Sequence, residues 1–196
     1  LLGCRPVCAK IGLYGSFQKT YLGHGTDKAL IGGLLGMNVD DLRLRNSLEI
    51  ARQEGLEYSF YPAELRHAHP NTVILDVDGE DGRHLTVQAS SVGGGEIRVN
   101  AIDGLEAGFS GHENTIVLTY ADTRGMIAAI SKQVSEAHLN IATMRVFRDT
   151  QGGKAIMALE LDGEAPDELL QALAQLRDVY RVAYLPAAEE NASCER

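Results

Sequence analysis

Residues 23 to 28 read Gly-His-Gly-Thr-Asp-Lys and place an imidazole, a hydroxyl and a carboxylate close together. Apolar residues follow at once, which predicts a loop that leads into a helix over residues 26 to 36. Glycines let a backbone approach a ligand, Thr26 or Asp27 is expected to cap the helix, and a helix N-terminus favours an anion such as a carboxylate. His24 is therefore a candidate base for a molecule bound there. The alternative is a capped loop with a surface histidine.

A second glycine-rich stretch follows a predicted hairpin. Strands are predicted at 72–77 and 84–90, and a polar turn joins them. The second strand leads into Ser-Ser-Val-Gly-Gly-Gly at 90–95, and a further strand is predicted at 96–102. Three consecutive glycines destabilise a sheet. They indicate either a bulge or wide turn without a ligand, or a backbone surface that lies flat against a ligand, a cluster or a partner chain.

The chain offers weak candidates for metal ligands. His67 and His69 would share a face if they lay on a strand, as metal ligands require, but no third ligand stands nearby. A solvated loop is the preferred interpretation. Cys4, Cys8 and Cys194 lack the close spacing of an iron-sulfur site and are too few for a disulfide framework, so we expect free thiols. The sequence therefore predicts no metal site in this chain.

The composition excludes some classes of partner. The chain has 196 residues, 44% of them apolar, a formal net charge of −9 and no basic excess in either half. Nucleic acid and anionic membranes are therefore poor partners. No apolar run is long enough to span a membrane and no signal peptide opens the chain, so a cytoplasmic location is expected. Leu1 to Gly3 looks like the end of a helix, so we also expect a preceding segment.

The elements around these motifs predict a mixed α+β domain over residues 1–112. A strand is predicted from Val7 to Phe17, with a bend at Gly15 and Ser16. A helix is predicted over 40–55, and a strand follows at 57–61, where Pro62 ends it.

The second half, residues 113–196, has a clearer pattern. Strands are predicted at 115–120, 141–147, 155–161 and 179–185, with one helix after Gly125, on which Ile127, Ile130 and Val134 recur at helical spacing, and another from Pro166. The order βαββαβ is that of a ferredoxin-like domain. Both helices of such a domain cover one sheet face, so we expect a partner chain on the other face, in a homodimer or a larger assembly. The tail from about residue 187 is expected to be disordered.

Three motifs together resemble a known family. Leu-Tyr-Gly-Ser at 13–16, Gly-His-Gly-Thr-Asp-Lys-Ala at 23–29 and the stretch 90–95 resemble the small (beta) subunit of bacterial iron-sulfur L-serine dehydratase. Asp-Thr-Arg-Gly at 122–125 and Leu-Asn-Ile at 139–141 are similar to the ACT domain that ends that subunit. The first half also resembles the allosteric substrate-binding domain of some 3-phosphoglycerate dehydrogenases.

The resemblance implies a division of labour in an L-serine ammonia-lyase. Such enzymes convert L-serine to pyruvate and ammonia with a 4Fe-4S cluster, whose cysteine ligands lie in the large (alpha) subunit, so this chain would be inactive alone. His24 matches the family's candidate base for the α-proton. The expected substrate-binding residues are Gly15, Ser16, Thr26, Asp27, Ser90, Ser91, Gly93, Gly94 and Gly95.

The resemblance leaves three further points open. The ACT domain has a possible effector site at Gly125, Asn140 and Ile141, or it serves only for pairing. The alternative function for the whole chain is a non-catalytic sensor of serine or a related amino acid. The family's small subunit usually begins with a Gly-Pro-Ser-Ser-Ser-His-Thr segment that this sequence lacks. If the molecule lacks that segment too, the site is incomplete.

Overall fold

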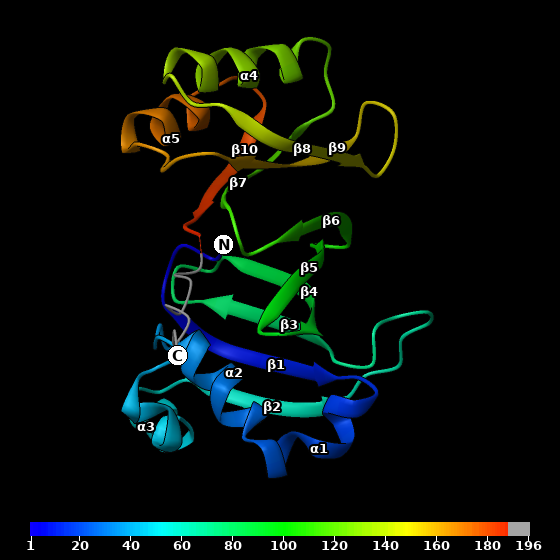
Figure 1. Ribbon diagram of the computed structural model, residues 1–196, viewed down its shortest axis with the longest axis vertical. Helices are drawn as coiled ribbons and strands as arrows, with labels where there is room; N and C mark the ends of the chain where they lie inside the picture. Colours follow the sequence, from blue (N-terminus) through cyan, green and yellow to red (C-terminus); the bar gives the residue numbers. More distant parts are fainter. Residues whose placement is uncertain (188–196) are drawn as a thin grey trace, which may run out of the picture. The chain divides into compact units, whose positions relative to one another are not determined.

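A computed structural model describes residues 1–187 and confirms an α+β architecture (Figure 1). The chain divides into an N-terminal unit, Leu2–Gly95 with Ile102–Gly104, and a C-terminal unit, which holds Leu1, Glu96–Ala101 and the residues from Leu105 onward. The tail from residue 188, with Cys194, lies outside the described residues, so the predicted disorder there is not addressed by the structure. Within residues 1–187, no helix is long and apolar enough to cross a membrane.

The N-terminal unit contains a mixed sheet with the strand order β2-β1-β3-β4. Its elements are β1 (Pro6–Leu13), α1 (Ser16–His24), α2 (Thr26–Leu34), the short 3-10 helix η1 (Leu42–Asn46), α3 (Ser47–Gln53), β2 (Glu57–Pro62), β3 (Thr72–Gly79) and β4 (His84–Gly93). β1 runs parallel to β2 and antiparallel to β3, and β3 and β4 form the predicted hairpin. Because β1 and β2 are parallel, both end at the same edge of the sheet.

The helices of this unit pack against one face of the sheet, where Ile11 from β1 and Ile31 from α2 are fully buried (Figure 1). The prediction of one strand from Val7 to Phe17 is wrong at its end, because Phe17 belongs to α1. Phe17 and Tyr21 stand four residues apart on α1 and both pack against the core. Their spacing is therefore that of a helix face, which the alternation in β1 concealed.

Other local predictions for this unit are close to the structure. The helix over residues 26–36 is α2, the helix over 40–55 is divided into η1 and α3, and the strand at 57–61 is β2. Residues 1–3 form no helix.

The C-terminal unit contains the predicted βαββαβ domain. Its elements are β5 (Glu96–Ile102), the unpredicted β6 (Leu105–Ser110), β7 (Asn114–Ala121), α4 (Met126–Glu136), β8 (Ile141–Arg148), β9 (Lys154–Leu161), α5 (Asp167–Ala174) and β10 (Val179–Leu185). The last four strands form an antiparallel sheet in the order β10-β7-β9-β8, with α4 and α5 packed on one face (Figure 1). Ile127 is 49% exposed, because the buried stripe of α4 runs through Met126, Ile130 and Val134 instead.

The other face of this sheet is covered within the chain, so the expectation that a partner must cover it is wrong. β7 and β9 turn Val117, Ile156 and Glu160 to this face, and all three side chains are buried. Strand β6 supplies the cover: the Ser110 backbone N–H and hydroxyl lie 3.3 and 3.4 Å from the Glu160 carboxylate, which accepts from both. Gly108 lies against side chains of β8. The sequence argument failed because β6 was not recognised.

Candidate functional site

His24 is the last residue of α1 and its side chain is exposed. The next residue, Gly25, is left-handed with φ 70°, and its N–H donates to the Tyr21 carbonyl. Gly25 also begins α2, so one residue ends the first helix and starts the second. The prediction that Thr26 or Asp27 caps α2 is wrong, because both lie inside the helix and no side chain caps its N-terminus. The imidazole thus stands at a sharp corner between two helices, open to a molecule from outside.

Asp27 has the opposite environment. Its side chain is only 5% exposed, and Oδ1 has no hydrogen-bond partner among the described residues. Ile31, four residues later and on the same side of α2, is fully buried in the core. Lys28 is exposed, and its carbonyl oxygen accepts a 2.7 Å hydrogen bond from the Ser47 hydroxyl of α3. The first turn of α2 is therefore held in place while one of its carboxylate oxygens lacks a donor.

This arrangement predicts that Asp27→Asn raises the stability of the chain. A buried carboxylate oxygen without a hydrogen bond destabilises by about 1–3 kcal/mol or more, and Asn removes its charge, whereas an acidic residue in a first helical turn stabilises by only about 0.3–1 kcal/mol. We expect a net gain of about 1 kcal/mol, or about 2–4 °C in Tm, by calorimetry. The control is Glu49→Gln, in the first turn of α3, where the carboxylate is exposed and no gain is expected. A Tm for Asp27→Asn at or below that of the control would contradict the prediction.

Gly15 and Ser16 form the turn that follows β1. Gly15 has φ 62°, and a side-chain carbon there would lie 2.6 Å from the Pro70 carbonyl oxygen, so only glycine fits. The Ser16 N–H donates to that oxygen at 2.7 Å, and the Tyr14 N–H donates to the Thr72 carbonyl at 3.0 Å. The turn is thus fixed to the segment that leads into β3.

Ser90 and Ser91, on β4, are fixed to the same segment. The Ser90 side chain is 3% exposed and its hydroxyl lies 2.7 Å from the buried Thr72 hydroxyl. The Ser91 N–H donates to the Asn71 carbonyl at 3.0 Å. The structure therefore brings Gly15 and Ser16 close to Ser90 and Ser91 through residues 69–72. Sequence reasoning missed these connecting residues, because a loop hydroxyl such as Thr72 carries no motif.

Gly93, Gly94 and Gly95 are exposed: Gly93 ends β4, and Gly94 and Gly95 form the turn that follows it. Their φ values are 100°, 64° and 84°, and no atom lies within 4 Å of where a side-chain carbon would stand. Three positive φ angles are reason enough for three glycines. No contact of these residues with His24, Thr26 or Asp27 is seen.

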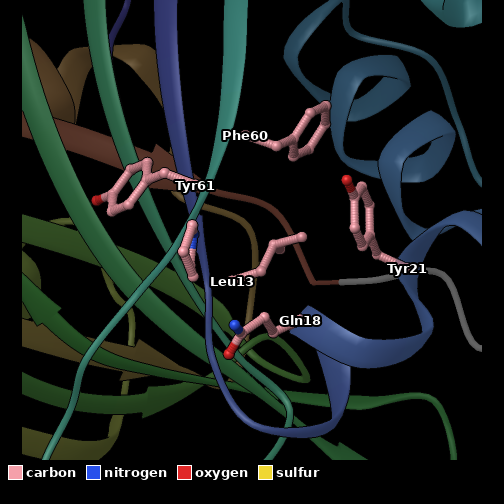
Figure 2. A pocket seen from close by; sticks show the side chains of 6 residues that line it. Leu13, Gln18, Tyr21, Phe60 and Tyr61 are labelled. Atoms are coloured by element: carbon pink, nitrogen blue, oxygen red, sulfur yellow. The ribbon is translucent and has the colours of Figure 1, made fainter.

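A small cavity of about 180 Å³ opens where β1 and β2 end, beside α1 (Figure 2). Tyr21 and Phe60 lie next to one another there, with ring centroids 5.6 Å apart. The lining residues are Leu13, Gln18, Tyr21, Phe60, Tyr61 and Pro62. None of them is charged, so this cavity offers no oppositely charged side chain to the carboxylate or the ammonium group of an amino acid. Sequence reasoning missed it because its aromatic residues come from separate elements.

The residues predicted for an ACT effector site are separated in one chain. Gly125 precedes α4, whereas Asn140 and Ile141 follow its other end. The 11 residues of α4 span about 16 Å at 1.5 Å per residue. The Asn140 amide donates to Asp162 at 2.6 Å. The chain by itself therefore does not assemble these three residues into one site.

Other titratable groups lie apart from these residues. On β3 and β4, the Asp78 carboxylate accepts a 2.7 Å hydrogen bond from His84 Nδ1 and raises the pKa of His84, and the charges of Asp76 and Asp103 add to this effect. His67 and His69 are exposed in the loop after β2, where His69 Nδ1 accepts from the Asn71 N–H. Cys4 and Cys8 are free thiols. Over residues 1–187, no three side chains of metal-binding type come together.

Comparison with known proteins places the chain in a family. The ACT domain model matches residues 114–178. The probable L-serine dehydratase, beta chain, of Bacillus subtilis (strain 168) is 34% identical over 182 residues, which are 93% of this chain and 82% of that protein. The L-serine dehydratase, beta chain, of Peptoniphilus asaccharolyticus is 35% identical over 162 residues, 82% of this chain and 73% of that protein.

A relative from another family is more distant. The D-3-phosphoglycerate dehydrogenase of Bacillus subtilis (strain 168) is 28% identical over 156 residues, 79% of this chain but only 30% of that enzyme. The two beta chains are more similar and match over most of their own length. The chain therefore belongs to the family of L-serine dehydratase beta chains.

Proposed function

We propose that this chain is the beta subunit of an L-serine dehydratase, which converts L-serine to pyruvate and ammonia together with an alpha subunit. The similarity to two beta chains at 34% and 35% identity, over most of each protein, carries this proposal. Their name implies a further subunit, which fits a chain whose candidate base is exposed at a helix corner. The alternative, a non-catalytic amino-acid sensor, is not favoured by these relatives.

His24 would act as the general base. It would take the α-proton of L-serine while the β-hydroxyl leaves, which gives aminoacrylate and water. Aminoacrylate rearranges to an imine, and water then converts the imine to pyruvate and ammonia, so the water lost in the first step is regained. An exposed imidazole suits this role, because it can meet a substrate that another subunit holds.

The cofactor proposed for the reaction is a 4Fe-4S cluster. Residues 1–187 offer no set of side chains arranged to hold it, so we assign the cluster to the alpha subunit. Bound there, it would supply a Lewis acid for the departing hydroxyl. The contribution of this chain is then limited to binding, orientation and proton transfer.

The substrate would contact the turn after β1 and the end of strand β4. Gly15, Ser16 and Ser91 lie at accessible or half-buried positions close to the same connecting segment. Ser90 is buried, so it would act by holding β4 in place. We also keep Thr26, Asp27 and the glycines at 93–95 as proposed substrate-binding residues.

The ACT domain is proposed to serve assembly, regulation or both. Because Gly125 and Asn140 lie at opposite ends of α4, an effector that touches both needs a second copy of the chain. We therefore still propose a homodimer. Its contact surface would differ from the sheet face that β6 covers. We also propose a cytoplasmic location, because the free thiols Cys4 and Cys8 are typical of a reducing compartment.

Reconstitution tests the proposed function. The beta subunit that contains this chain is mixed with cluster-loaded alpha subunit, and pyruvate is measured after addition of L-serine. We expect pyruvate only when both subunits are present. Turnover by the alpha subunit alone at the full rate would contradict the proposal. Tight L-serine binding by this chain alone, with no turnover by the pair, would favour the sensor.

A further inference from the structure

We infer that Thr72 is a positioning residue for L-serine in this enzyme, because its hydroxyl holds the turn after β1 and the serines of β4 at a fixed separation. The inference rests on the proposed function. It concerns a residue outside the motifs that link the chain to its relatives.

The Thr72 side chain is fully buried at the start of β3. Its hydroxyl donates to the His69 carbonyl oxygen at 2.7 Å, and this uses its only proton. The Ser90 hydroxyl, 2.7 Å away, must therefore donate to Thr72 Oγ1. One oxygen atom thus joins the loop after β2 to strand β4.

Backbone hydrogen bonds extend this connection to the turn after β1 and to Ser91 on strand β4. From the β1 side, the Tyr14 N–H donates to the Thr72 carbonyl and the Ser16 N–H donates to the Pro70 carbonyl. From the β4 side, the Ser91 N–H donates to the Asn71 carbonyl. Residues 69–72 therefore determine how far Gly15 and Ser16 stand from Ser91. Two side-chain groups hold the shape of this segment: the Thr72 hydroxyl, and the His69 ring, whose Nδ1 accepts from the Asn71 N–H.

Replacing Thr72 by valine keeps the shape and removes the hydroxyl. The His69 carbonyl oxygen then loses the buried hydroxyl that donates to it, and the contact between Thr72 and the Ser90 hydroxyl is lost, so this segment is no longer held at that point. A shift changes the spacing between the turn after β1 and Ser91 on β4, whereas His24, at the other end of α1 from Ser16, takes part in none of these hydrogen bonds. Substrate binding should therefore suffer more than the chemical step.

The test compares three variants of the beta subunit in the reconstituted enzyme. For Thr72→Val we expect the KM for L-serine to rise about tenfold or more, with kcat within about threefold of the unmodified enzyme. Thr72→Ser restores the hydroxyl and should return KM to within about threefold. The matched control is Thr115→Val, since Thr115 is equally buried but its hydroxyl donates to the Glu113 carbonyl, in the C-terminal unit.

The control separates positioning from folding. A purely structural defect lowers the fraction of active enzyme, which reduces kcat and leaves KM unchanged. If Thr72→Val shows that pattern, or the same KM as Thr115→Val, the inference is overturned. If Thr72→Val does not fold, Ser90→Ala decides: a raised KM supports the inference and an unchanged KM overturns it. Absence of turnover in the unmodified pair would instead count against the proposed function.

Discussion

His24→Ala is expected to lower the turnover of the reconstituted serine dehydratase by about a hundredfold or more. Removal of a general base typically reduces a rate by about 10²–10⁴-fold, because the substrate proton then passes only to water or to a poorly placed group. The His24 side chain is exposed and ends a helix, so its loss leaves no cavity. The Tm of the chain should therefore stay within about 1–2 °C of its original value.

His138→Ala provides the matched control. His138 is also exposed and also follows the end of a helix, α4, but in the C-terminal unit. Pyruvate formation at saturating L-serine is measured for both variants, with Tm recorded on the same samples. Near-normal turnover of His24→Ala would remove its role as the base. An equal loss in both variants would point to a general effect on assembly.

The sequence predicted those parts of the fold in which local pattern and tertiary contact agree. In the C-terminal unit, Ile130 and Val134 recur at helical spacing on α4 and are buried, as predicted. Ile127 fits the same spacing but is half exposed, because Met126 takes the buried position. Alternation failed for Phe17, since a single turn at Gly15 changes the period from that of a strand to that of a helix.

The candidate site was less accessible to sequence reasoning, because burial and hydrogen bonding depend on partners far apart in the chain. His24 is exposed, as a base in a shared site must be, and Gly15 is required by its contact with Pro70. The burial of Asp27 and Ser90 has no sequence signature, since both are ordinary surface residue types.

Gly15→Ala is expected to destabilise the chain by about 2–4 kcal/mol, which is more than we expect for the same change at Gly36. Positive φ alone disfavours alanine by about 1–2 kcal/mol. At Gly15 the added carbon would also lie 2.6 Å from the Pro70 carbonyl oxygen and 2.9 Å from Pro70 Cα. These are backbone atoms, and the oxygen already accepts from the Ser16 N–H. The turn must therefore move as a whole, since no side chain can rotate away.

Gly36→Ala tests a positive φ without a steric clash. Gly36 has φ 74°, similar to Gly15, but no atom lies within 4 Å of the added carbon. We expect a loss of about 1 kcal/mol and a Tm lower by about 2–4 °C, against about 5–10 °C for Gly15→Ala, by calorimetry on the complete chain. Equal losses would mean that Pro70 yields easily and that the turn after β1 is not held by it. In that case the fixed spacing attributed to residues 69–72 would lose its basis, because the same carbonyl anchors Ser16.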